Sequence, residues 1–157
     1  MDKIVLKTSA TPEDMWNSVV DALYGTDNYD NEVLRRLFTA LNYHNEMERG
    51  LHEGFIENTL ETVQNEGFDP FIRELTDALE YVGAVDYITH VRTHLPRLYH
   101  LSFQYQGALE TGSEIEINET EFLNAAARAD EDYQNLKTNL EEKITNVISE
   151  KKHYIFE

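Results

Sequence analysis

The chain of 157 residues contains no cysteine, only three prolines and seven glycines, and no long apolar run. Without cysteine, disulfides, thiolate metal ligands and a thiol nucleophile are excluded, which fits a reducing compartment. No segment approaches the roughly 18 apolar residues of a membrane-spanning helix, and segment 1–16 lacks the apolar run of a signal peptide. We therefore expect a cytoplasmic protein that does not bind membranes.

Basic residues are scarce as well. Thirteen Lys and Arg face thirty Asp and Glu, which gives a formal net charge of -17. Contact with nucleic acid would bring like charges together, without the counterion release that drives such binding. A small domain needs a net charge of magnitude only about 2 to 8 for solubility. The excess argues against nucleic acid and favours a basic protein as partner, although adaptation to high salt would also produce it.

The composition is that of a globular helical domain. Apolar residues make up 41% of the chain, with nine Tyr and seven Phe, so we expect one domain spanning 1–157. Thr11 followed by Pro12 predicts a helix that runs to Gly25, because a hydroxyl cap and Pro at the first helical position are typical helix starts. Apolar spacing predicts a second helix over 33–41. The fold class expected is all-α, a bundle of six to seven helices.

Boundaries are also predicted for the middle of the chain. Asn45 with Glu48 resembles a capping box and opens a third helix that ends near Gly67. Gly50 and Gly54 lie inside this helix, where each costs about 1 kcal/mol relative to Ala. We therefore expect either close packing of a neighbour or a local break there.

The remaining boundaries are less regular. A fourth helix is expected from Asp69 to Gly83, and a fifth helix ends at Pro96. Segment 98–117 alternates as strands do around a Thr-Gly turn, so a short hairpin and a helix both stay open. A capping box at Asn118 then predicts a helical run without interruption.

No catalytic motif stands out, because the sequence has no GxSxG, P-loop or GxGxxG pattern. Two sets at spacing i, i+4 and i+8 each place metal-ligand types on one helical face. They are His44, Glu48 and His52, and Asp86, His90 and His94. Neither set forms HExxH, and we interpret them as structural histidines. We therefore expect no catalytic residues, no metal and no cofactor.

The acids are concentrated in two blocks. Residues 46–80 contain ten acids and two Arg, a net of -8, and residues 110–132 contain eight acids and one Arg, a net of -7. Segment 83–109 holds only Asp86 against two Arg. On a helical wheel, four acids fall within about 80° and predict one acidic ridge. They are Glu46, Glu53, Glu57 and Glu61.

Candidate partner-binding residues are drawn from both blocks. Like charges one turn apart destabilise a helix by a few tenths of a kcal/mol, so something other than local stability is expected to retain them. The candidates are Glu46, Glu53, Glu57, Glu61, Glu66, Asp69, Glu74, Asp77, Glu114, Glu116 and Glu119.

Three segments resemble a bacterial family of small acidic all-helical proteins that includes a DNA mimic. The segments are HEGFIEN at 52–58, ALEYVGAVDYI at 78–88 and DEDYQNL at 130–136. The family usually shows Asn-Gly-Gly-Phe followed by Gln and aromatic residues. Here Gly54 and Phe55 match, whereas Glu53, Glu57 and Asn58 depart from that pattern. The resemblance implies a helical bundle whose carboxylates stand in for phosphates and occupy the DNA-binding face of another protein, such as a helix-turn-helix regulator.

Together these observations predict a non-enzymatic inhibitor or regulator that binds a basic DNA-binding protein. An immunity-type protein that neutralises a basic toxin, such as a nuclease, is the alternative, because it would use the same electrostatics. A metal-dependent enzyme built on the histidine sets is a third hypothesis. A homodimer is a further option.

Overall fold

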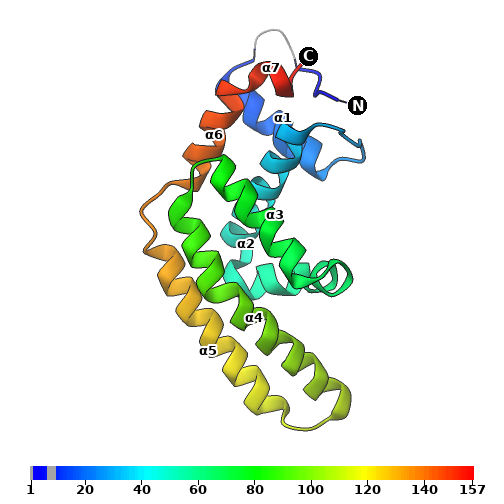
Figure 1. The fold of residues 1–157 in the computed structure, drawn as a ribbon, viewed down its shortest axis with the longest axis vertical. Coiled ribbons are helices and arrows are strands. Elements are labelled where there is room, and N and C mark those ends of the chain that lie inside the picture. The colour runs from blue at the N-terminus through cyan, green and yellow to red at the C-terminus, as the bar shows by residue number, and fades with distance from the viewer. Residues whose placement is uncertain (1, 7–9) are drawn as a thin grey trace.

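The computed structural model describes residues 2–6 and 10–157, and seven helices make up most of this part (Figure 1). They are α1 (Pro12–Tyr24), α2 (Glu32–Glu66), α3 (Phe68–Tyr81), α4 (Val85–Thr111), α5 (Ile115–Gln134), α6 (Leu140–Glu150) and α7 (Lys152–Ile155). The predicted all-α class and the number of helices are confirmed. No helix in the described ranges combines the length and apolar character needed to cross a membrane.

The two ends of the chain lie together at one end of the bundle (Figure 1). The Ile4 N–H donates to the Ile155 carbonyl at 2.8 Å. Asn31 is the N-cap of α2, and its side chain reaches both ends, donating to the Asp2 carbonyl at 2.7 Å and the Tyr154 carbonyl at 2.6 Å. Its Oδ1 meanwhile accepts from two N–H groups of the first turn of α2. One side chain therefore caps the longest helix and connects it to both chain ends by hydrogen bonds.

The start of α1 follows the sequence closely. Thr11 caps the helix, accepting from the Asp14 N–H at 3.1 Å, and the Asp14 carboxylate accepts from the Thr11 N–H at 3.0 Å. Pro12 is the first helical residue and Gly25 is the C-cap. Both predicted ends of this helix are confirmed.

Helix α2 corrects the prediction of a new helix at Asn45. The chain runs through this position as helix, because neighbouring side chains such as Tyr43 and Met47 are buried in the core and hold the helix there. The break lies at Leu51, with φ 50° and ψ -149°, immediately after Gly50. A local break is thus confirmed. Close packing of a neighbour, the alternative, is not found, because a Cβ added at Gly50 or Gly54 would meet no neighbouring atom within 4 Å.

Helix α4 corrects two further predictions. Pro96 does not end the helix; it lies at an exposed position inside α4, where it removes one backbone hydrogen bond of the helix. Residues 98–111 continue α4, so the hairpin is wrong. Alternation in this segment reflects a half-buried long helix, with Leu98 and Leu101 buried and Phe103 partly exposed. Gly112, with φ 73°, ends the helix in a left-handed conformation.

The C-terminal part is also divided differently from the prediction. Helix α5 begins at Ile115 and not at Asn118, whose side chain donates to the Glu114 carbonyl at 2.8 Å. The helical run is interrupted, because α5 ends at Gln134 and α6 starts only after the N-cap Asn139. Helices α4 and α5 form an antiparallel pair that extends away from the chain ends (Figure 1).

Candidate functional site

Acids of the two blocks meet at a hollow between α2, α4 and α5, which we call the acidic groove. Glu53 and Glu57 reach it from α2, and Glu119 reaches it from α5. Its volume is about 260 Å³. The other lining residues are Leu60, Ser102, Tyr105, Gln106, Leu109, Phe122 and Leu123. The groove therefore joins carboxylates from both blocks with an apolar surface.

The groove has a defined local geometry. Glu53 and Glu57 are one turn apart on the second half of α2, a rise of about 6 Å, and both are exposed. The Tyr105 hydroxyl of α4 donates to Glu119 Oε2 at 3.2 Å, which positions that carboxylate. Leu109 and Leu123 are 46% and 38% exposed, so apolar surface is open to a partner beside the charges.

Glu46 does not belong to an acidic ridge. Its side chain is only 11% exposed, and its carboxylate accepts from Asn58 Nδ2 at 2.7 Å and lies 3.7 Å from Arg49. The helical wheel assumed an unbroken helix, whereas the bend at Leu51 changes the direction of α2 between Glu46 and the later acids. The single ridge from 46 to 61 is therefore wrong.

The other candidate acids lie outside the groove. Glu66 and Glu74 line a second hollow of about 300 Å³ between α1, α2 and α3, where Glu74 pairs with Arg35 at 3.1 Å. The remaining five candidates are exposed and lie elsewhere, on α2, on α3 and at the start of α5. They are Glu61, Asp69, Asp77, Glu114 and Glu116. Among the described residues, the groove thus gathers three of the eleven candidates.

The two histidine sets are linked, and we call the result the histidine network. His52 Nδ1 lies 2.7 Å from Asp130 Oδ1, which also accepts from the His52 backbone N–H at 3.0 Å. On its other side, His52 Nε2 lies 2.9 Å from His90 Nε2. His94 Nε2 lies 2.7 Å from Asp132 Oδ2. Two acids of α5 therefore hold histidines of α2 and α4.

Burial sets the protonation of this network. His52 is fully buried and His90 is 5% exposed. Burial lowers the pKa of His52, and burial together with the neighbouring His52 and His94 lowers the pKa of His90 to about 4. With both rings neutral, the hydrogen-bond pattern assigns a proton to His52 Nδ1, facing Asp130, and leaves its Nε2 to accept from His90 Nε2–H.

The network supports the bend in α2. Residues after Leu51 restart the helix, so their first N–H groups lack partners from the preceding turn. The Asp130 carboxylate accepts a hydrogen bond from one of these groups, the His52 backbone N–H, as an N-cap side chain does. Tyr133 packs edge-on against the network, with its ring centroid 5.9 Å from that of His52 and 5.7 Å from that of His90.

The two candidate sets, which the sequence analysis interprets as structural histidines, do not assemble as metal-ligand sets. His44 lies apart from His52, with its ring 6.3 Å from that of Trp16 and its Nε2 3.9 Å from Glu141. Within residues 2–6 and 10–157, no three His, Asp or Glu side chains are placed to hold a metal ion. Local sequence patterns do not predict the network, because His52 and Asp130 are 78 positions apart.

Comparison of the chain with family models, curated proteins and solved structures gives no match. The resemblance of segments 52–58, 78–88 and 130–136 to the DNA-mimic family therefore stays a prediction.

Proposed function

We propose that this protein is a non-enzymatic, DNA-mimic-like inhibitor or regulator that binds a basic DNA-binding protein. The observation that carries the proposal is the acidic groove, where Glu53 and Glu57 of one block meet Glu119 of the other. The net charge of -17 would speed encounter with a basic partner and repel nucleic acid. Salt is expected to weaken the complex strongly.

The groove favours a particular kind of partner surface. Carboxylates at its edge suit Lys and Arg side chains, and the exposed parts of Leu109 and Leu123 suit apolar side chains beside them. An amphipathic helix with basic residues provides both on one face. The recognition helix of a helix-turn-helix regulator, which normally faces phosphates and base edges, is such an element.

The proposal is tested by neutralising the groove in the triple variant Glu53→Gln, Glu57→Gln and Glu119→Gln. The matched control neutralises three exposed acids outside it, Asp21→Asn, Glu80→Gln and Glu150→Gln, so both variants lose the same charge. Each protein is immobilised, exposed to a lysate at low salt and eluted with a salt gradient. The partner is then purified and its affinity measured by titration calorimetry.

We expect the groove variant to lose at least tenfold in affinity, because two or more charge-assisted contacts are removed, whereas the control keeps most of it. The partner should bind duplex DNA and be displaced from this protein by DNA, since both would occupy one face. Equal losses in the two variants would show that total charge, and not the groove, determines binding. A captured nuclease whose activity is blocked would support the immunity-type alternative instead.

A further inference from the structure

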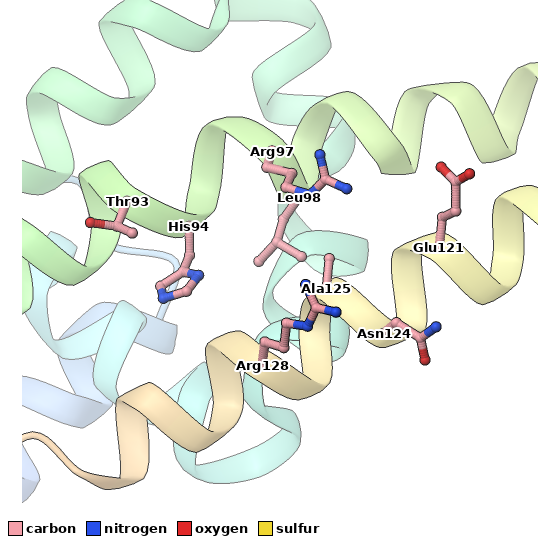
Figure 2. Close-up of a pocket in the computed structure, with 8 residues that line it drawn as sticks. All are labelled: Thr93, His94, Arg97, Leu98, Glu121, Asn124, Ala125 and Arg128. Carbon is pink, nitrogen blue, oxygen red and sulfur yellow. The ribbon is translucent and has the colours of Figure 1, made fainter.

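A third hollow, which we call the arginine pocket, lies between α4 and α5 and has a volume of about 500 Å³ (Figure 2). Arg97 of α4 and Arg128 of α5 both line it, and Arg128 points from α5 towards α4 (Figure 2). Leu98 and Ala125 supply apolar surface, and the Asn124 amide lies nearby. Volumes of roughly 300 to 1,000 Å³ are usual for small-molecule sites.

The two guanidinium groups have no partner in the described part of the chain. Neither Arg97 nor Arg128 makes a side-chain hydrogen bond or an ion pair there, whereas Arg35 and Arg36 both bind the Glu32 carboxylate. Among the described Lys and Arg side chains only Arg35, Arg36 and Arg49 are ion-paired, so what distinguishes Arg97 and Arg128 is that these two exposed, unpaired side chains line the same hollow. Two like charges in one hollow repel each other unless an anion lies between them.

The arginine pocket is separate from the acidic groove. At about 100° per residue, Asn124 and Arg128 lie on the opposite side of α5 from Glu119 and Phe122, which line the groove. The pocket also falls in the part of α4 where the sequence is poorest in acids. One face of the α4–α5 pair thus carries the groove carboxylates, and the other carries two guanidinium groups with Glu121 beside them.

We propose that the arginine pocket binds a small oxyanion, a phosphate or carboxylate group attached to a compact apolar or sugar portion. Arg97 and Arg128 would each donate two N–H groups to the oxyanion, as guanidinium groups do with phosphate and carboxylate. Asn124 also lines the pocket, and Leu98 and Ala125 would contact the remainder of the molecule. Glu121 also lines the pocket and opposes the anion, so it limits the affinity.

The test is a titration of the intact protein with inorganic phosphate, glucose 6-phosphate and succinate, followed by NMR of backbone and arginine side-chain N–H groups. Glucose is the neutral control. We expect anions, and not glucose, to shift the Nε–H resonances of Arg97 and Arg128 at concentrations up to about 10 mM. Comparison of the phosphate and succinate arms identifies which oxyanion is preferred.

Variants locate the binding. Arg97→Gln or Arg128→Gln should weaken it about tenfold, and Glu121→Gln should strengthen it by removing an opposing charge. Arg92→Gln is the matched control, since Arg92 is exposed on the same helix and does not line the pocket. The absence of shifts with all three anions, or unchanged affinity in both pocket variants, would overturn the proposal. Neutralising the acidic groove should leave anion binding intact, so the two proposals fail separately.

Discussion

The buried histidine network predicts that the folded protein loses stability as the pH falls from 7.5 to 5. The pKa of His90 is about 4 in the folded chain, against about 6.5 when unfolded. Between these values the unfolded state binds more protons, so the free energy of unfolding rises with pH. The contribution of His90 is therefore complete above pH 6.5 and is lost progressively as the pH falls towards 4.

The magnitude follows from the two pKa values. A group with these values contributes about 2 kcal/mol less to the free energy of unfolding at pH 5 than at pH 7.5. Burial lowers the pKa of His52 as well, so its contribution has the same sign. Asp130 and Asp132 act in the opposite direction on His90, because their negative charges favour its protonated form. Burial is the larger cause, so the net effect stays destabilising at low pH.

Urea unfolding at a series of pH values measures this loss directly. The variant His90→Gln should be less stable at pH 7.5 but should lose about 2 kcal/mol less between pH 7.5 and 5. His100→Gln, at an exposed position of the same helix, should keep the loss seen with the unmodified protein. NMR titration of His90 provides the independent value. A midpoint near 6.5, or an identical pH dependence after His90→Gln, would refute the reasoning.

Four further substitutions have expected outcomes in urea unfolding at pH 7.5. Gly54→Ala should raise the free energy of unfolding by up to about 1 kcal/mol, because the added Cβ meets no atom, whereas Gly67→Ala should lower it by about 1 kcal/mol, because φ is +92°. Asn31→Ala should lower it by about 1–2 kcal/mol through loss of the cap, with faster amide exchange at the chain ends. Asp130→Ala should lower it by about 1–3 kcal/mol, because two donors of buried His52 lose their acceptor; a change below 0.5 kcal/mol would contradict its role at the bend.

Sequence predicted the fold best where a helix end is specified locally. Thr11 with Asp14 forms the cap of α1, and Gly67 ends α2, because these residues act on backbone groups a few positions away. Prediction failed where burial overrides local preference. Asn45 offers a cap but lies in a helix held by core contacts, and Pro96 costs one hydrogen bond in a helix long enough to tolerate it.

The candidate site was predicted in part. Spacing placed Glu53 and Glu57 together correctly, since four residues make one turn of a regular helix. It did not predict that Glu119 would join them, because contacts between helices depend on packing distant in sequence. The arginine pocket also depends on packing between distant segments. The depletion of acids in segment 83–109 is visible in the sequence, but the sequence does not predict that Arg97 and Arg128 line one pocket.

The bend in α2 connects these results. A backbone such as that of Leu51 costs about 1–3 kcal/mol and persists only when its surroundings hold it, and Asp130 of α5 does so through His52. An unbent helix would keep Glu46 on the side of Glu53, as the wheel assumed; the bend instead leaves Glu46 buried. The contact of Asp130 with His52 joins α5 to α2 at the bend. The acids of the groove lie on the same two helices. Loosening this contact with Asp130→Ala should therefore weaken partner binding as well as stability, although no carboxylate of the groove is changed.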